Sequence, residues 1–534
     1  MRSLLELDVS LSLGLGSRPT WRTKVKQILG SYLLFILGLT TAAYAQIPFP
    51  NPINHIILID QENRTVDNLL GSNSPKNQFY LPALVSSTAG KAYKIVNGRK
   101  DVFSVNAVAA PLASIFGSPG SSEAFDFDPS HSHGAWGQAC DAPSITDPSN
   151  DCAMDGFNFV KVFCDPKATT GCPGPAFPTY TYVRYKDVAP YFQIASQYGY
   201  ANYFFQTNQG PSFPSHQFIF GGTSQPGNGP EPNWFVVENL TSSSTPNGCL
   251  APAGTSIALV DPATQQENAS TYPCFDHATM ADVFAAASPK ITWTYYTAGQ
   301  GSLWTAPDAI QSICRVNSEG NCSGPYWTQG SANGFVDVNP THVLTDIGKC
   351  SLKQVNWAIP TGAASDHAGI TDGSGPSWVA SIVNAIGNSS CTELHNGRQV
   401  KYWEDTVILI TWDDWGGWYD TIVPPAPPLK APAVVASNVY GFRVPLLVVS
   451  AYTPAGTVDN TFGLDFGSLL KFIEHIFNLG NIPPGDYADS YSTGDLHEFF
   501  QFNRPPRPFE SITAPLDAGF FLDPSSPIEA PDND

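Results

Sequence analysis

Two short apolar runs in this chain each stop abruptly at acidic side chains. The run at residues 54–60 ends at Gln61-Glu62-Asn63-Arg64, and the run at residues 406–412 ends at Asp413-Asp414. Both runs are rich in β-branched residues and have the length of buried strands. Strands that are apolar on both faces are typical of parallel sheets covered by helices on both sides. In such sheets the ligand site lies beyond the carboxyl ends of the strands, where these acids would sit.

The rest of the chain continues this pattern. Helical periodicity at Pro376 to Ile386 and at Phe466 to Phe477 alternates with further apolar runs. These additional candidate strands are Ile291 to Tyr296, Gln354 to Ile359 and Val444 to Ser450. The alternation predicts an α/β fold with a central, mostly parallel sheet sandwiched by helices. Two segments rich in Gly, Pro, Ser and Thr, at residues 222–270 and 302–340, are expected to be long loop insertions.

The beginning of the chain has the layout of a secretory signal peptide. Basic residues between Arg22 and Lys26 precede an apolar run from Ile28 to Leu39, and Ala43-Tyr44-Ala45 offers a cleavage site. A membrane anchor is the alternative, although the apolar run is shorter than the ~20 residues that span a bilayer. We therefore expect a signal peptide at residues 1–45, a main domain at 46–503 and a Pro- and Asp-rich tail at 504–534, extended or partly disordered.

The cysteines support export to an oxidising compartment. The chain has ten of them, all beyond residue 45 and in close sequential couples. The simplest pairing joins Cys140 to Cys152, Cys164 to Cys172, Cys249 to Cys274, Cys314 to Cys322 and Cys350 to Cys391. Spacing alone does not decide connectivity, and the absence of a C-x-x-C pair gives no indication of structural zinc. The prediction is a secreted or periplasmic protein with disulfide-linked insertions.

The charge of the chain excludes one class of partner. The formal net charge is −20 and the pI is near 4.7, with no Lys- or Arg-rich stripe. Such a surface repels phosphate backbones, so nucleic acid is not expected as a partner.

The acids after the two runs form a candidate metal site. Glu62 and Asn63 follow the first run and Asp413 and Asp414 follow the second, so three carboxylates and one amide meet as oxygen donors. Oxygen donors suit a hard divalent cation, whose identity stays open. The alternative is that each is an ordinary loop acid. Their occurrence at two strand ends favours a site.

A candidate nucleophile is Ser212, which lies between Gly210-Pro211 and Phe213-Pro214. A hydroxyl on such a turn can be presented to a metal that lowers its pKa. Pro-Ser in a turn is often only turn chemistry. The chain lacks the G-x-S-x-G elbow at this position, which argues against an α/β-hydrolase esterase.

Histidines in loops rich in Gly, Ser and Asp are candidates for phosphate binding or for protonation of a leaving alkoxide. They are His131, with His133 close by, and His367 in Ser365-Asp366-His367. The histidines at positions 55, 277, 395, 475 and 497 are interpreted as structural or surface residues.

Six motifs in chain order resemble the bacterial phosphoesterase family of phospholipases C and related acid phosphatases, whose fold is akin to that of alkaline phosphatase. The motifs are Gln61-Glu62-Asn63-Arg64, the His131 loop with Met154-Asp155-Gly156-Phe157, Gly210-Pro211-Ser212, Ser365-Asp366-His367, the run from Trp412 to Asp420, and Gly441-Phe442-Arg443-Val444-Pro445. The resemblance covers most of the chain after residue 45. Six ordered motifs are far more specific than any one of them.

The resemblance implies a metal site and a covalent mechanism. The implied metal ligands are Glu62, Asn63, Ser212, Asp413 and Asp414. Ser212 would attack phosphorus, release the alcohol and then lose its phosphoryl group to water. His131 and His367 would bind phosphate or serve the leaving group. A bound cation would also reconcile an acidic chain with an anionic phosphate-ester substrate.

The chain departs from the family pattern at two places. Thr421 follows Asp420 where the family often has His, and Asp465-Phe466-Gly467 replaces a second His-containing motif. Serine at 212, where phospholipases tend to carry threonine, favours a phosphomonoesterase of the acid-phosphatase type. The alternative is a phospholipase C acting on phosphodiester lipids at a membrane, although no basic amphipathic helix indicates interfacial binding. A non-catalytic secreted binding protein is a third hypothesis.

Overall fold

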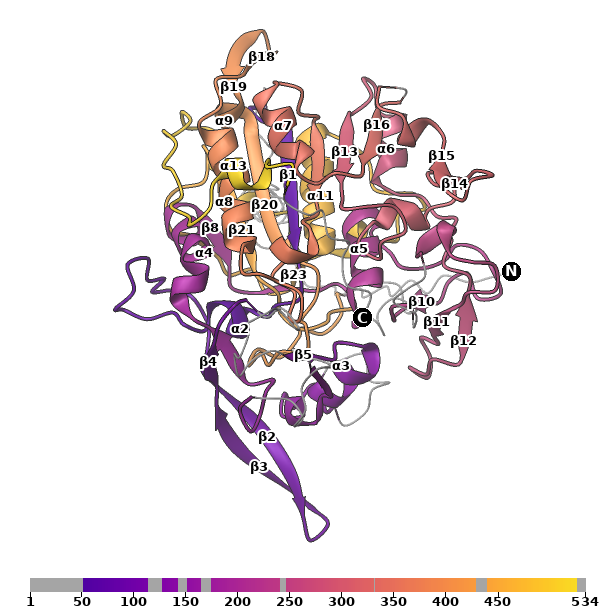
Figure 1. Cartoon of the computed structure of the whole chain (residues 1–534), viewed down its shortest axis with the longest axis vertical. Helices are drawn as coiled ribbons and strands as arrows, with labels where there is room; N and C mark the ends of the chain where they lie inside the picture. The colour runs from indigo at the N-terminus through magenta and orange to yellow at the C-terminus, as the bar shows by residue number, and fades with distance from the viewer. Residues whose placement is uncertain are drawn as a thin grey trace, which may run out of the picture. The chain divides into compact units, whose positions relative to one another are not determined.

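An eight-stranded sheet forms the centre of the protein in this computed structural model (Figure 1). The structure describes residues 51–113, 127–142, 151–164, 174–240, 246–330, 332–428 and 439–525, all of which fall in one unit, Pro48–Asp534. In spatial order the strands are β16 (Gly334–Asp337), β13 (Trp293–Tyr296), β17 (Val355–Ala358), β1 (His55–Gln61), β20 (Thr406–Trp412), β21 (Leu446–Ser450), β8 (Gly199–Ala201) and β22 (Thr457–Asp459). Strand β21 is antiparallel to both neighbours, and the other pairs are parallel.

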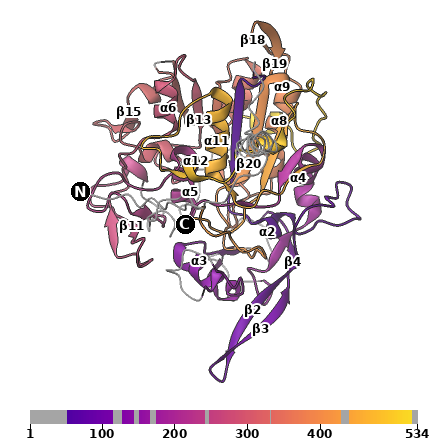
Figure 2. The same ribbon diagram turned by 180° about the vertical axis from the view of Figure 1, so that it is seen from behind.

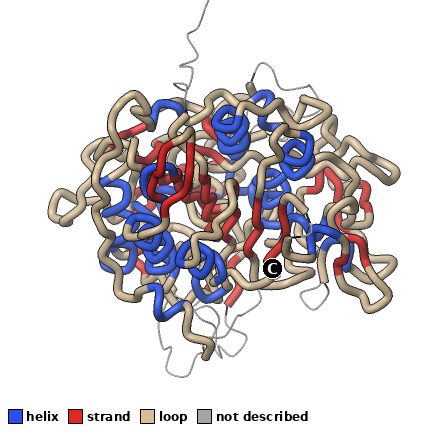
Figure 3. The backbone as a smooth tube through the Cα atoms, turned by 90° about the horizontal axis from the view of Figure 1, so that it is seen from above, coloured by secondary structure: helices blue, strands red, loops and turns tan. Residues whose placement is uncertain are grey.

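Helices lie on both faces of this sheet (Figures 1, 2 and 3). One group comprises α4 (Tyr185–Gln197), α7 (His342–Gly348) and α8 (Gly375–Gly387), and the other comprises α5 (Ser212–Gly221), α11 (Phe466–Phe477) and α12 (Ala488–Tyr491). Every residue of β1, β17, β20 and β21 is buried, which explains their continuous apolar sequence. The predicted α/β class with a mostly parallel central sheet is confirmed.

Helix α11 shows how local sequence sets an element. Asp465 caps its first turn by accepting a hydrogen bond from the Ser468 backbone N–H at 3.1 Å, and Asn478 ends it in the left-handed conformation. Asp465 is therefore the helix cap at the place where the family pattern has a histidine motif. The departure from the family at this position has a structural role in this chain.

The two predicted insertions are more ordered than expected. The first carries a three-stranded sheet of β10 (Phe235–Val236), β11 (Ile257–Val260) and β12 (Ala269–Thr271). The second carries the hairpin β14 (Arg315–Val316) and β15 (Cys322–Ser323), and it ends with β16 of the central sheet. The interpretation of this last segment as loop was wrong, because a four-residue edge strand leaves almost no periodic signal.

Four of the predicted disulfides are confirmed. They join Cys140 to Cys152, Cys249 to Cys274, Cys314 to Cys322 and Cys350 to Cys391. The fifth predicted pair includes Cys172, which lies outside the described residues, as does the predicted signal peptide at 1–45. Among the described residues, no helix combines the length and apolar character needed to cross a bilayer.

The described part of the C-terminal tail is packed onto the domain. Arg507 donates to the backbone oxygens of Gln197 and Thr453, at 2.6 and 3.0 Å. Ile512 is buried, and the ring of Phe509 lies 4.9 Å from that of Trp403. We expected few apolar contacts here, and through residue 525 the tail makes more of them than its composition suggested.

Candidate active site

The carboxyl ends of β1 and β20 meet at the centre of the sheet. The two strands pair in parallel with Gln61 opposite Trp412, and the Asp413 backbone N–H donates to the Gln61 oxygen at 3.0 Å. Because both strands end at the same level, Glu62 and Asp413 leave the sheet side by side. The sequence expectation that these acids gather at one edge is met by the geometry.

Ser212 is the first residue of helix α5 and is buried in this cluster of acids. Its Oγ lies 3.2 Å from Glu62 Oε2, 3.3 Å from Asn63 Oδ1 and 3.2 Å from Asp414 Oδ2. The helix N-terminus adds positive potential where a phosphorylated side chain would need it. This arrangement would allow one metal ion to be bound by the Ser212 hydroxyl together with these three oxygen atoms.

The amide of Asn63 faces oxygen atoms on one side and imidazoles on the other. Its Oδ1 lies 3.0 Å from Glu62 Oε2 and 2.7 Å from Asp413 Oδ1. With the amide turned over, its nitrogen would donate to both carboxylates, so the oxygen orientation is favourable only when a cation lies among these atoms. Together with the buried and unpartnered Oδ2 of Asp413, this crowding fits a hard divalent ion.

Two residues of the cluster, Asp60 and His216, were missed at the level of sequence. His216 Nε2 contacts Glu62 Oε1 at 3.0 Å, and its Nδ1 lies 3.2 Å from Asp60 Oδ2. All three side chains are fully buried. Their positions in the sequence indicate a shared face. Asp60 and Glu62 are two residues apart, as on one face of a strand, and Ser212 and His216 are four residues apart, as on one face of a helix.

The raised pKa values of the buried carboxylates also favour a bound cation. Burial, followed by repulsion from neighbouring carboxylates, raises the pKa of Asp60, Glu62 and Asp413 well above their ordinary values. Burial raises the pKa of Asp414 to about 7 and lowers the pKa of His216 to about 3. Among the described residues, His216 is the basic side chain paired with these acids, and it is held neutral. Positive charge from a metal would relieve the repulsion.

The two predicted loop histidines reach the same place. His131 Nδ1 contacts the backbone oxygen of Pro129 at 3.1 Å, which directs Nε2 toward Asn63 Nδ2 at 3.3 Å. His367 Nδ1 contacts the Ala368 oxygen at 2.6 Å, and its Nε2 lies 2.7 Å from the same nitrogen. The ring centroids are 5.8 Å apart. All seven residues predicted for the site therefore lie together.

Two glycines after β20 allow these loops to approach. A Cβ on Gly416 would lie 2.2 Å from the Asn63 oxygen, and one on Gly417 would lie 2.5 Å from Pro129 Cβ. Both have positive φ, at 60° and 72°. The Gly-Gly pair therefore brings the loop that begins at Asp413 against the Asn63 turn and the loop that leads to His131.

Other residues of the six motifs form hydrogen bonds and ion pairs around the site. Arg64 donates through Nε and Nη2 to the Asp366 backbone oxygen at 2.8 and 2.6 Å, which holds the turn that presents His367. Asp420 pairs with Arg443 at 3.1 Å, and Thr421 donates to Asp67 Oδ2 at 2.5 Å. Thr421 thus replaces the family histidine with a structural hydrogen bond.

A cavity of about 200 Å³ lies next to Pro211, the residue before Ser212. Its lining also includes His131, Phe163, Glu238 and Leu240. Burial, followed by repulsion from Glu267, raises the pKa of Glu238 to about 8. This cavity is the candidate route for substrate to the site.

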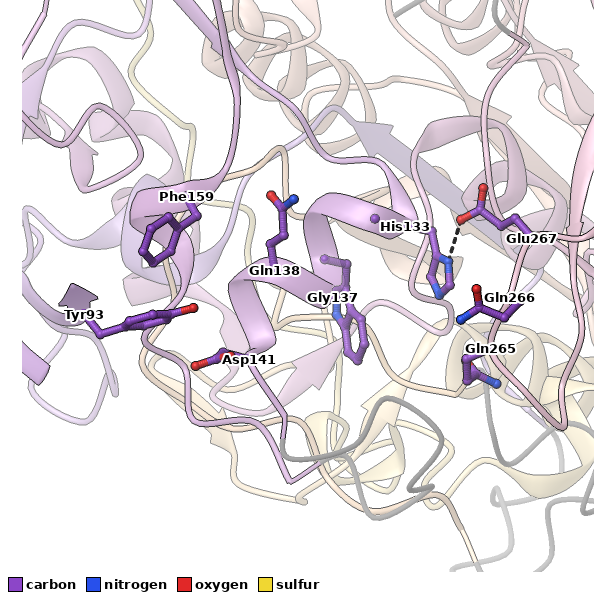
Figure 4. A pocket seen from close by; sticks show the side chains of 11 residues that line it. Tyr93, His133, Gly137, Gln138, Asp141, Phe159, Gln265, Gln266 and Glu267 are labelled. Atoms are coloured by element: carbon purple, nitrogen blue, oxygen red, sulfur yellow. Dashed lines mark hydrogen bonds and ion pairs between the residues drawn. The ribbon is translucent and has the colours of Figure 1, made fainter. Parts of the chain in front are cut away.

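A larger cavity of about 720 Å³ lies on the outer side of helix α3 (His133–Cys140) (Figure 4). Figure 4 shows Tyr93 and Phe159 at one end and Gln265 and Glu267 at the other. The His133 ring is held there by an ion pair between its Nδ1 and Glu267 Oε1 at 2.9 Å. His133 therefore lines this outer cavity, whereas His131 faces Asn63 in the candidate site.

We predict that His216→Gln weakens metal binding about 10- to 100-fold, because His216 orients Glu62 and such supporting residues have effects of that size. Calorimetric titration of divalent ions into chelator-stripped protein measures it. His277→Gln is the matched control, since His277 is a buried histidine outside the cluster, with Nδ1 on the Ala278 oxygen. Equal affinity in His216→Gln and wild type would contradict the prediction.

Comparisons with known proteins agree with this geometry. A family model described as Phosphoesterase family matches residues 53–480. Phospholipase C B of Mycobacterium tuberculosis is 29% identical over 191 residues, covering 32% of this chain and 34% of that protein. Hemolytic phospholipase C of Pseudomonas aeruginosa is 22% identical over 353 residues, covering 60% of this chain and 43% of its own length. Non-hemolytic phospholipase C of Burkholderia pseudomallei is 29% identical over 185 residues, covering 30% and 24%.

These matches span about a quarter to under half of the relatives' own lengths. Their names favour the phospholipase C alternative over the acid-phosphatase hypothesis that Ser212 suggested. The crystal structure of Ps i-CgsB covers 57% of this chain and 69% of its own with a TM-score of 0.29 and 10% identity, too weak a likeness to identify the fold. The alkaline-phosphatase-like topology stays a prediction from sequence.

Proposed function

Because this chain belongs to the Phosphoesterase family, we propose that it is a metal-dependent phosphoric-ester hydrolase of the phospholipase C type, which cleaves the phosphodiester of a phospholipid. The observation that carries the proposal is the buried Ser212 Oγ, within 3.2–3.3 Å of oxygens of Glu62, Asn63 and Asp414. The relatives named phospholipase C support the choice of a lipid diester.

In this proposal Glu62, Asn63, Asp413 and Asp414 hold the cation together with Ser212, and Asp60 and His216 orient Glu62. A divalent ion bound there would lower the pKa of a hydroxyl and neutralise phosphoryl oxygens. Helix α5 fixes the nucleophile in the centre of the cluster, so that little reorganisation precedes attack.

The reaction then follows from the chain's own groups. Ser212 gives its hydroxyl proton to a contacting carboxylate, Glu62 or Asp414, as its Oγ attacks phosphorus. The bond to the leaving alcohol breaks, and a water then hydrolyses the phosphoserine. His131 and His367 each present Nε2 to the site, since their Nδ1 atoms face backbone oxygens. In the doubly protonated form, which keeps Nδ1–H on the backbone oxygen, one ring donates its Nε2–H to a phosphoryl oxygen while the other passes its Nε2 proton to the leaving alkoxide.

The proposal includes export of the protein. Residues 1–45 would be removed as a signal peptide, residues 46–503 would form the catalytic domain, and residues 504–534 would be the tail. Four disulfides support an oxidising compartment. The substrate is then an extracytoplasmic phosphate ester, and nucleic acid is not expected as a partner.

We predict that the mature protein, from residue 46 onward, hydrolyses a phosphorylcholine diester faster than a chromogenic phosphomonoester. Removal of the metal by a chelator should abolish both reactions. Side-by-side rates with and without chelator, followed by restoration with divalent ions, measure this. Preference for the monoester would return the acid-phosphatase hypothesis to first place. Absence of turnover on both substrates with all ions would favour a non-catalytic secreted binding protein.

A further inference from the structure

A long hairpin projects from the domain at residues 89–106. Strand β2 (Ala89–Val96) pairs antiparallel with β3 (Arg99–Asn106) along eight positions, and Asn97-Gly98 forms the turn with φ of 50° and 75°. Figures 1 and 2 show its distal half extending beyond the rest of the described chain. The base of the hairpin is packed, because Ala92 and Val105 are buried, so its direction is set by the core.

The distal half exposes apolar side chains. Ile95 is 62% exposed, Val96 43% and Val102 48%, and they lie within eight residues of one another. Cross-strand neighbours share a face, so Ile95 lies beside Lys100 and Val96 beside Arg99. Exposed branched residues at the end of a rigid hairpin are costly in water and indicate a partner that buries them.

The same tip is basic in an acidic chain. Residues 89–106 contain Lys91, Lys94, Arg99 and Lys100 against Asp101 alone, a formal charge of 4 − 1 = +3. Lys94 pairs with Asp101 at 3.6 Å and Lys100 pairs with two acids outside the hairpin, so Lys91 and Arg99 are its cations without an ion pair among the described residues. With −20 for the whole chain, the remaining residues carry −20 − 3 = −23. An anionic surface therefore attracts the hairpin and repels the rest of the chain, which would orient the molecule with the tip of the hairpin toward that surface.

The hairpin lies at the end of the sheet that holds the candidate active site. Helix α3 begins two residues after His131 and ends beside Asp141, whose carboxylate Lys100 Nζ contacts at 2.5 Å. Lys100 also reaches Asp155 at 3.0 Å. The cavity of Figure 4 joins Tyr93 of the hairpin to His133 next to the site loop. Helix α3 and this cavity thus connect the hairpin to the loop that carries His131.

We propose that the tip of this hairpin, residues 94–99, inserts into the headgroup region of an anionic lipid bilayer and brings the candidate active site to that surface. The inference rests on the proposed function, and it supplies an interfacial element for a phospholipase. Apolar side chains flanked by Lys and Arg match the boundary between acyl chains and anionic headgroups. An anionic bilayer offers both an apolar interior and negative headgroups, and the proposed substrate is itself a membrane lipid.

The test is co-sedimentation of the full mature chain with vesicles of phosphatidylcholine containing phosphatidylglycerol, and with phosphatidylcholine alone. We expect binding to the anionic vesicles that weakens with added salt. Ile95→Ser with Val96→Ser should lower the partition coefficient at least about tenfold, as expected for loss of buried apolar area. Lys94→Gln and Arg99→Gln should each lower it about fivefold.

A second hairpin provides the matched control. Leu394, in β18 (Thr392–His395), is 70% exposed, and this strand turns through Asn396-Gly397 into β19 (Arg398–Lys401). Figure 1 shows the β18–β19 hairpin at the opposite end of the domain from β2–β3. Leu394→Ser should bind vesicles like wild type. All variants should retain turnover of a soluble short-chain diester.

The proposal would be overturned by wild type that does not sediment with anionic vesicles, or by tip variants that sediment as wild type does. Vesicle binding lost equally in Leu394→Ser would also overturn it, because the effect would not be specific to the tip. Failure of the proposed function has a different signature. In that case wild type would not turn over the soluble diester, while tip-dependent vesicle binding would be unaffected.

Discussion

Replacing Ser212 with alanine should reduce turnover of a phosphate diester at least about 10³-fold while the fold and the melting temperature stay close to wild type. The side chain is small, so its removal leaves little empty volume, and α5 keeps its packing. What is lost is the proposed nucleophile, the Ser212 Oγ that lies 3.2 Å from oxygens of Glu62 and Asp414. Initial rates over a range of metal concentrations, with circular dichroism for the fold, measure this.

The threonine variant distinguishes a nucleophile from a structural hydroxyl. Ser212→Thr keeps an Oγ in the same place and should retain turnover far above that of Ser212→Ala. Covalent trapping provides a second readout, because only a variant with a hydroxyl at 212 can accept the phosphoryl group. Rates in Ser212→Ala that approach wild type would remove Ser212 from the mechanism.

Replacing Arg443 with leucine should destabilise the protein by about 3–5 kcal/mol, a cost typical of breaking a buried ion pair. Arg443 Nη2 lies 3.2 Å from Asp67 Oδ1 and 3.1 Å from Asp420 Oδ2, and the three side chains are fully buried. Its Nη1 also donates to the Asn202 backbone oxygen at 3.0 Å. Without the guanidinium, two buried carboxylates would lose the positive charge that balances them, and the Asn202 carbonyl would lose this donor.

Urea denaturation followed by tryptophan fluorescence measures this loss of stability. Arg184→Leu is the control, because the Arg184–Asp187 pair is partly exposed, at 36% and 22%, and such pairs contribute about 0–1 kcal/mol. A similar change in both variants would contradict the assignment of Arg443 as the centre of a buried network. The Gly441–Pro445 motif would then need another explanation.

The parts of the fold predicted from sequence are those with strong local signals. Strand β20 and helix α11 have the predicted bounds, and β1 is shifted by one residue. A run of β-branched residues and a capped apolar helix each determine their own structure. Strands β8, β16 and β22 were missed because they are three or four residues long, and pairing with distant strands rather than local pattern creates them.

The same distinction applies to the site. Seven of its residues were predicted because they stand in motifs or at strand ends. Asp60 and His216 were missed because their contacts join the end of β1 to helix α5, which are distant in sequence. Ser212 and Glu62, for example, are 150 residues apart. The sequence contains no basic amphipathic helix, and the basic hairpin with exposed apolar residues is marked in the sequence by its Asn97-Gly98 turn.

The four disulfides have a consequence for how the protein is made. Each joins a cysteine to the next one along the chain, with separations of 12, 25, 8 and 41 residues. A polypeptide threaded through a membrane amino end first therefore presents each thiol with its correct partner before any later cysteine has emerged. If the protein is exported as proposed, oxidation in order of appearance would yield these four bonds without reshuffling, and a thiol oxidase would suffice for them with little help from a disulfide isomerase.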